Sequence, residues 1–310
     1  MNTVTKLGAY AAALALVAGG GWALGAAAGP APTPEPKPAG HADSHAGGTD
    51  AGHTATPVSD QPSGLASTAN GYMFAPGTST LPAGTTQPFT FRILGPTGAP
   101  VTAFDVAHEK RMHLIVVRRD TADYQHLHPE LAADGTWWVN LRLPQAGSYR
   151  LFADFAPTGG TPTTLGTDLA APGEFTPRHH PASREATVDG YQVRLDGDLL
   201  PGQSSPLRLT VRKDGRDVTD LQPYLGAYGH LVALRTSDLA YLHVHPDGNP
   251  GDGRTPAGPT VTFHTEVPSA GSYRLFLDFQ HAGTVRTAEF TVDTGTGTAA
   301  PHDADGHTHN

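Results

Sequence analysis

Histidines with a repeated spacing are the residues of this chain whose types and positions could do chemistry. Each set consists of one histidine, twelve further residues, and then His-x-His followed by proline. The two sets are His113, His126, His128 with Pro129, and His230, His243, His245 with Pro246. Residues two apart on a β-strand point to the same face, so each His-x-His pair presents two neighbouring imidazoles. Neutral imidazole is a ligand of Cu(II) and Zn(II), and the spacing therefore indicates metal binding.

A tight turn before each His-x-His pair sets which residues lie opposite one another. A turn over residues 119–122 places His126 opposite Ile115. The same register places His128 opposite His113. The corresponding pairs in the second set are Val232 with His243 and His230 with His245. Opposed Cβ atoms lie about 5 Å apart and diagonal ones about 7–8 Å apart, so three imidazoles can reach one ion at about 2 Å. We expect one three-histidine metal site in each set.

Apolar residues surround both predicted sites on the same strand faces. They are Ile115, Val117 and Tyr124 in the first set, and Val232, Leu234 and Tyr241 in the second. Apolar walls lower the local dielectric constant and favour the neutral imidazole, which is the form that binds metal.

Two acidic residues recur at one position of a repeated strand. Asp154 and Asp278 occupy the same place in the segments "SYRLFADF" and "SYRLFLDF". A carboxylate there can orient a histidine ring or pair with Arg118 or Arg235, and both roles stay open.

Two further polar residues are confined to the first set. His108 and Glu109 precede it, whereas the second copy has Leu225 and Gly226 at these positions. We therefore expect the two sites to bind differently.

The ligand types limit which metal is expected. The chain has no cysteine, 3 methionines and 17 histidines. This composition disfavours a blue-copper site or a Cu(I) thioether site and favours copper as Cu(II) or zinc. In one alternative, the histidines are packing residues of a structural or interaction module. In a second, three histidines with an open position form a catalytic zinc site. Because neither a general base in both copies nor a nucleophile elbow is apparent, we predict that the protein is not an enzyme.

The chain repeats itself between its two ends. "HLIVVR" at 113–118 corresponds to "HLVALR" at 230–235, and "AGSYRLFADF" at 146–155 corresponds to "AGSYRLFLDF" at 270–279. Matches in the same order indicate duplication of one domain. We predict copies at residues 71–177 and 186–293, joined by residues 178–185.

Each copy has short apolar segments separated by Gly, Pro, Asp or Asn. In the first copy the expected strands are 86–94, 112–118, 123–128, 136–143, 148–155 and 172–176. This spacing predicts an all-β protein with two tandem antiparallel β-sandwiches of immunoglobulin-like or cupredoxin-like type.

The two ends of the chain differ from the repeats in composition. Residues 7–29 carry no charge and follow Lys6, which predicts a transmembrane anchor or a cleaved signal with everything after residue 30 outside the cytoplasmic membrane. Residues 30–70 and 294–310 are expected to be disordered. Their histidines could collect metal loosely, and these are His41, His45, His53, His302, His307 and His309.

The net charge constrains the partners. The formal charge is −9, from 20 basic and 29 acidic residues, and no basic stripe is present. Nucleic acid is therefore excluded as a partner. The partners that we expect are metal ions and the membrane that holds the N-terminal segment, whereas a protein partner is not identified.

Several segments carry a resemblance to known proteins. They are "KLGAY", "HEKRMHLIVVRRD", "QHLHPE", "LQPYLGAYGHLVALR", "LAYLHVHP" and "AGSYRLFLDF". Nearly the whole chain resembles a group of uncharacterised membrane-anchored exported proteins of high-GC Gram-positive bacteria. The second copy also resembles YtkA-like and heavy-metal-binding modules and the small copper-resistance β-sandwich proteins. The resemblance implies a role outside the cytoplasm in handling metal, copper above all. The Met-rich sites of some copper-resistance proteins are not repeated here.

Overall fold

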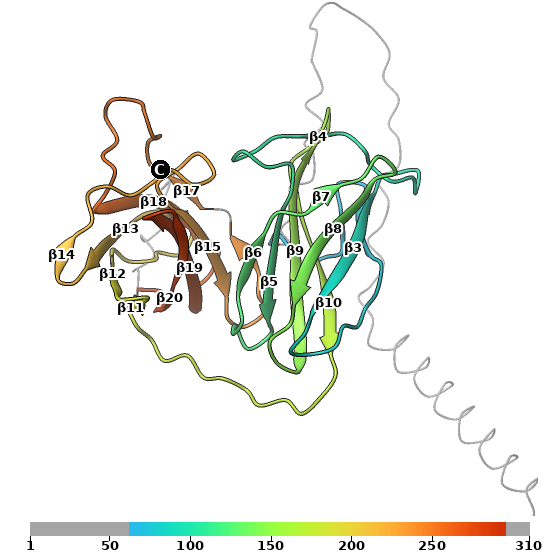
Figure 1. Cartoon of the computed structure of the whole chain (residues 1–310), viewed down its shortest axis with the longest axis horizontal. Coiled ribbons are helices and arrows are strands. Elements are labelled where there is room, and N and C mark those ends of the chain that lie inside the picture. Colours follow the sequence, from blue (N-terminus) through green and yellow to red (C-terminus); the bar gives the residue numbers. More distant parts are fainter. Residues whose placement is uncertain (1–61, 243, 296–310) are drawn as a thin grey trace, which may run out of the picture. The chain divides into compact units, whose positions relative to one another are not determined.

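The computed structural model describes residues 62–242 and 244–295. The secondary structure of these residues consists of β-strands, and the paired strands are antiparallel (Figure 1). The all-β prediction is therefore confirmed. Within the described ranges, no helix is long and apolar enough to cross a membrane. The predicted anchor and most of the predicted linker and C-terminal tail lie outside the described residues.

The first repeat forms a sandwich of two sheets. One sheet has the order β1-β2-β3-β8-β7, and the other has the order β10-β9-β5-β6 with β4 paired to β9. The strands of the first sheet are β1 (Thr68–Ala69), β2 (Tyr72–Pro76), β3 (Thr86–Leu94), β8 (Thr136–Arg142) and β7 (Glu130–Leu131). Those of the second are β10 (Thr163–Ala171), β9 (Gly147–Pro157), β5 (His113–Arg118), β6 (Gln125–Leu127) and β4 (Phe104–Asp105).

The second repeat forms a sandwich of the same kind. Its sheets have the orders β11-β12-β13-β18-β17, with β14 paired to β13, and β16-β15-β19-β20. The strands of the first sheet are β11 (Glu185–Val188), β12 (Tyr191–Asp196), β13 (Ser204–Lys213), β18 (Thr260–Glu266), β17 (His245–Pro246) and β14 (Arg216–Asp217). Those of the second are β16 (Tyr241–Leu242), β15 (His230–Arg235), β19 (Ser272–His281) and β20 (Thr284–Asp293).

Strand β5 is buried on both of its faces. Leu114 and Val116 pack into the core of the first sandwich. Ile115 and Val117 belong to a separate apolar cluster, called here the interface cluster, which joins the two repeats. Its members are Ile115, Val117, Phe152, Val232, Leu234, Leu239, Tyr241 and Phe276, with Tyr124 packed against them. The apolar residues predicted around the histidines therefore lie where the repeats meet.

Two sequence predictions for the first repeat need correction. Residues 172–176 form no strand, and β10 ends at Ala171. Pro172 begins this segment and Pro177 follows it, and neither has a backbone N–H to donate to a neighbouring strand. The prediction of a disordered linker is wrong for residues 62–70, which belong to the fold. Strand β1 pairs with β2 through a two-residue turn at Asn70 and Gly71, whose φ angles are 53° and 80°. Asn-Gly favours this hairpin turn because both residues tolerate positive φ.

The predicted hairpin register is correct in the first repeat. Strands β5 and β6 place Ile115 opposite His126. In the second repeat, β15 and β16 follow the predicted register as far as Leu242, which pairs with Ala233.

Beyond Leu242 the prediction is wrong, because His245 lies opposite His264 of β18 rather than opposite His230. Val244 is buried in the core of the second sandwich, and by His245 the chain pairs with β18 of the other sheet.

Candidate metal centre

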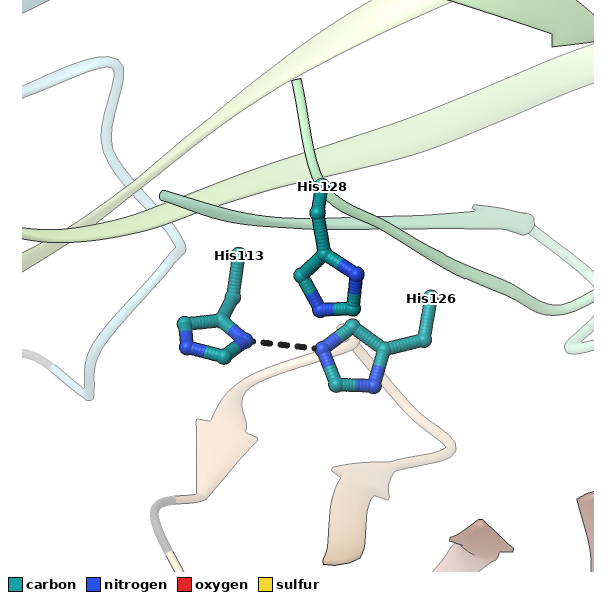
Figure 2. Close-up of side chains that lie close together, drawn as sticks. All are labelled: His113, His126 and His128. Carbon is teal, nitrogen blue, oxygen red and sulfur yellow. Dashed lines mark hydrogen bonds between the residues drawn. The ribbon is translucent and has the colours of Figure 1, made fainter. Parts of the chain in front are cut away.

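The three histidines of the first set lie together. His113 is the first residue of β5, His126 is in β6, and His128 follows β6 directly. Each offers one nitrogen, and the three nitrogens lie within 4.8 Å of one another. Figure 2 shows the three rings turned toward a common point, with the His128 ring beside the contact between the other two. The triad is thus a group from adjoining segments of one sheet.

In two of these rings, the nitrogen that faces away from the triad is hydrogen-bonded to an oxygen atom. His113 Nε2 lies 3.0 Å from the carbonyl oxygen of Ala107. His126 Nδ1 lies 2.8 Å from Asp278 Oδ2. A carbonyl oxygen and a carboxylate oxygen only accept hydrogen bonds, so both ring nitrogens carry the hydrogen and donate it. A neutral imidazole has one N–H, and its second nitrogen then presents a lone pair.

The two remaining nitrogens face each other. His113 Nδ1 and His126 Nε2 are 3.0 Å apart. With both N–H groups committed to oxygens, a hydrogen bond between these two nitrogens requires one additional proton, and a metal ion bound to both nitrogens can take the place of that proton. Two imidazole nitrogens bound to one Zn(II) at about 2.0–2.1 Å in tetrahedral geometry are about 3.3 Å apart. The observed spacing is close to that of two ligands of one ion.

His128 supplies a third nitrogen in need of a partner. Its Nε2 is buried and makes no hydrogen bond. A buried polar atom without a partner costs about 1–3 kcal/mol, which coordination to an ion would remove. The donor set of the triad therefore fits Cu(II) or Zn(II), as imidazole ligands do.

Burial keeps two rings of the triad neutral. Removal from water lowers the pKa of His113 to about 3, and the neighbouring histidines add to the effect. Burial likewise lowers the pKa of His128 to about 3, together with His126 and His113. Both rings are therefore unprotonated at pH 7, and no proton competes with a metal ion for their lone pairs.

Residues of the second repeat border the triad. His230 is the counterpart of His113, and its Nε2 lies 2.9 Å from the carbonyl oxygen of Tyr224, just as His113 binds Ala107. Burial lowers the pKa of His230 to about 4. The ring centroids of His126 and His230 are 6.5 Å apart. A cavity of about 40 Å³ lies between the repeats, large enough for a water molecule or an ion, and its polar lining comprises His108, His113, His126, Asp154 and His230.

The other predicted site residues take different places. His108 is exposed and packs edge-on against His113 and His230, with ring centroids 6.1 and 5.5 Å apart. Glu109 is exposed. Asp154 accepts a hydrogen bond from Thr164 Oγ1 at 3.0 Å.

The arginines named as alternative partners of the two aspartates bind elsewhere. Arg118 pairs with Asp120 and Asp123, and Arg235 pairs with Asp238. Asp278 binds His126. Of the two roles that the sequence left open for Asp278, the structure therefore shows the orientation of a histidine ring and not the pairing with an arginine.

The second predicted site has no counterpart of the first in the described residues. His243 lies outside them. His230 points toward the first triad, and His245 pairs along the backbone with His264. Within residues 62–242 and 244–295, the triad of the first set is the one group found with metal-ligand spacing.

Sequence reasoning missed that the carboxylate comes from the other repeat. The recurrence of Asp154 and Asp278 marked the right position in the strand. Nothing in the spacing within one copy reveals which repeat a side chain on the outer face of the sheet will meet.

In the comparison with known protein families, one family model matches each of the two repeats. A model described as a domain of unknown function, DUF8832, matches residues 67–171 and again residues 186–296. No curated protein matches the sequence.

Among solved structures, three comparisons illustrate the similarity. The Escherichia coli adhesin FdeC is 12% identical with a TM-score of 0.25, over 74% of this chain and 65% of that chain. The Yersinia pseudotuberculosis adhesin InvE is 14% identical with a TM-score of 0.21, over 72% and 58%. Salmonella alpha-2-macroglobulin reacted with methylamine is 12% identical with a TM-score of 0.24, over 74% and 15%. This chain thus spans less than two thirds of each of them, and scores this low support no argument about function.

Proposed function

The chain belongs to the DUF8832 family, and from this premise and the geometry of the triad we propose that it is a non-catalytic metal-binding protein. His113, His126 and His128 bind one Cu(II) or Zn(II) ion. The observation that supports this proposal is the contact of His113 Nδ1 with His126 Nε2 at 3.0 Å, where both other ring nitrogens already donate to oxygen.

The biological role follows from the predicted location. Residues 7–29 form an uncharged N-terminal segment, which would tether the repeats to the outer face of the cytoplasmic membrane. A protein there that holds one ion on neutral histidines would sequester the metal or pass it to a partner.

A second candidate is a structural or interaction module in which the histidines only pack. The fold favours it, because immunoglobulin-like sandwiches serve many unrelated functions as rigid modules. The hydrogen bonds of His113 and His126 also show that two rings already have structural partners. This candidate predicts that the folded repeats bind no metal tightly.

Calorimetric titration of the full chain with Cu(II) and Zn(II) separates the two candidates. The six tail histidines (41, 45, 53, 302, 307 and 309) are first replaced by alanine, so that they contribute no binding. We expect one tightly bound ion per chain, lost in His126→Ala/His128→Ala. The matched control is His264→Ala, which removes an exposed histidine of β18 and should leave binding unchanged. Absence of tight binding in the parent protein would leave the interaction module.

The variant His243→Ala/His245→Ala tests the second predicted site in the same titration. Loss of a further ion in this variant would show that the second histidine set also binds metal.

A further inference from the structure

We propose that the metal centre is a joint between the two repeats. Asp278 of the second repeat holds the His126 ring of the first in its ligating orientation, so that metal binding and packing of the repeats stabilise each other. This inference rests on the proposed function of the triad and adds to it a positioning residue and a consequence for the arrangement of the domains.

The Asp278 carboxylate is fixed on both of its oxygens. The residue is 2% exposed. Oδ2 accepts the hydrogen bond from His126 Nδ1 at 2.8 Å, and Oδ1 accepts one from Thr287 Oγ1 at 2.6 Å. Thr287 lies directly opposite Asp278 in the pairing of β19 with β20. A buried carboxylate is costly unless hydrogen bonds satisfy it, so the contact with His126 is one that the protein must retain.

Two neighbouring contacts join the first repeat to the second. Tyr124 and His126 are two residues apart and share one face, as do Phe276 and Asp278. The Tyr124 ring stacks on Phe276 with centroids 4.1 Å apart and planes 6° apart. His126 binds Asp278 in the adjoining position. The apolar stacking therefore brings the carboxylate to the histidine and excludes water from the hydrogen bond.

The hydrogen bond to Asp278 decides which nitrogen of His126 can bind metal. The Asp278 carboxylate accepts a hydrogen bond from Nδ1–H of His126. The lone pair of this imidazole is then on Nε2, which faces His113. A carboxylate on the outer nitrogen also raises the basicity of a ligating imidazole, and loss of such a partner typically costs about 10–100-fold in metal affinity. If the repeats separated, His126 would lose this partner and its ring would be free to rotate.

Linkage makes the effect reciprocal. If the packed arrangement binds the ion about 10–100-fold more tightly than the separated one, the ion favours the packed arrangement by the same factor. An occupied site would thus hold the two sandwiches as one rigid body, and loss of the ion would loosen them.

The metal affinity of an Asp278 variant tests whether this carboxylate supports metal binding by His126. In the full chain without tail histidines, Asp278→Asn should weaken Zn(II) binding about 10–100-fold while one ion still binds. The Cu(II) electron paramagnetic resonance spectrum should change with it, because the imidazole nitrogen loses its anionic partner. Tyr124→Phe is the matched control, since it keeps the stacking on Phe276 and removes only a buried hydroxyl without a hydrogen-bond partner. It should leave affinity unchanged.

A second variant tests the same contact without changing Asp278 itself. Phe276→Ala leaves the triad and Asp278 in the sequence but removes the ring on which Tyr124 stacks. It should also weaken Zn(II) binding, because the carboxylate is then less firmly held against His126.

The distance between the repeats tests the second half. The chain has no cysteine, so Thr97→Cys and Arg216→Cys, at exposed positions on different repeats, give a specific pair of spin labels. We expect Zn(II) to narrow the label–label distance distribution in the parent protein and not in Asp278→Asn.

The outcomes separate this inference from the proposed function. Parental affinity in both Asp278→Asn and Phe276→Ala, with loss of binding in His126→Ala/His128→Ala, would overturn the joint and retain the metal site. A distance distribution insensitive to Zn(II) at saturation would overturn the reciprocal effect. No Zn(II) binding by the parent protein would overturn both proposals.

Discussion

The two repeats share the histidine spacing, yet the described structure assembles a triad from the first set alone. In the first repeat, β6 pairs with β5 as far as Leu127, and the chain reaches the other sheet at Glu130. In the second repeat, β16 ends at Leu242 and His245 already pairs with β18 of the other sheet. The earlier crossing removes His245 from the position that His128 occupies, although the two segments match in sequence.

This difference shows that a duplicated ligand pattern does not secure a duplicated site. The hairpin register is common to both copies, but the point at which the chain leaves the sheet is not. In the second copy, Asp278 of β19 binds His126 of the first site rather than a histidine of its own copy. Duplication has thus provided a supporting residue for one centre from the copy that does not build its own triad in the described residues.

The largest expected change in the free energy of unfolding comes from substitutions in the interface cluster, to which both repeats contribute. Phe152 and Phe276 occupy equivalent positions and are fully buried, and each contacts a tyrosine of the other repeat, Tyr241 and Tyr124 respectively. Each change to alanine should lower the free energy of unfolding by about 3–5 kcal/mol. Urea unfolding followed by tryptophan fluorescence measures this.

The same pair of variants sharpens the comparison when metal is added. Phe276→Ala should weaken Zn(II) binding more than Phe152→Ala does, because Phe276 also adjoins the contact between His126 and Asp278, whereas Phe152 acts on the site only through the packing of the repeats. Equal loss of affinity in both variants would contradict the asymmetry between the repeats.

The next effect compares His113 with its counterpart His230. Both rings donate Nε2–H to the carbonyl of the residue six positions earlier. His113→Ala should weaken Zn(II) binding by more than about 100-fold, equivalent to about 2.7 kcal/mol, since it removes a ligand. His230→Ala removes a neighbour of the site and should change affinity by only a few-fold. Isothermal titration gives both values, and a greater loss in His230→Ala would assign the ligand role to the second repeat.

How far sequence alone reaches can be judged from particular residues. Alternation in segments such as Thr86–Leu94 predicted the strands, because one face must be buried, and the turn before His126 predicted the hairpin register. Strand β10 was missed, since its Thr, Gly and Ala residues form no strongly apolar pattern. Asp278 was placed in the right strand, but its partner depends on packing between the repeats, which no pattern within one copy encodes.

Acid should destabilise the metal-free protein through the triad. Burial holds the pKa of His113 and of His128 at about 3, below the ordinary value of 6.5. The unfolded chain therefore binds more protons than the folded chain between about pH 6.5 and 3, and stability is lost as the pH falls through this range. The slope is at most about 1.4 kcal/mol per pH unit for each histidine.

Urea unfolding in the presence of a chelator, repeated between pH 7.5 and 4, measures this slope. His113→Leu should lessen it, because no ring remains to be protonated at that position. His264→Ala, at an exposed position, should not change it. Equal slopes in the parent protein and His113→Leu would contradict a neutral, buried His113.

The smallest effect concerns a tyrosine that both repeats use to tie down the turn before β9 or β19. Tyr149 donates its hydroxyl hydrogen to the carbonyl of Gln145, and Tyr273 does so to Ser269, both at 2.8 Å. Tyr149 also lies 3.1 Å from Asp123 Oδ2, beside the turn that positions His126 and His128. Tyr273→Phe should cost about 1 kcal/mol, as loss of one hydrogen bond does. Tyr149→Phe should cost more, about 1.5–3 kcal/mol, because its one hydroxyl hydrogen is shared between the Gln145 carbonyl and the charged Asp123 carboxylate. Thermal unfolding measures the loss of stability in both variants. The difference between the two losses reports the contribution of the contact between Tyr149 and Asp123 in the first repeat.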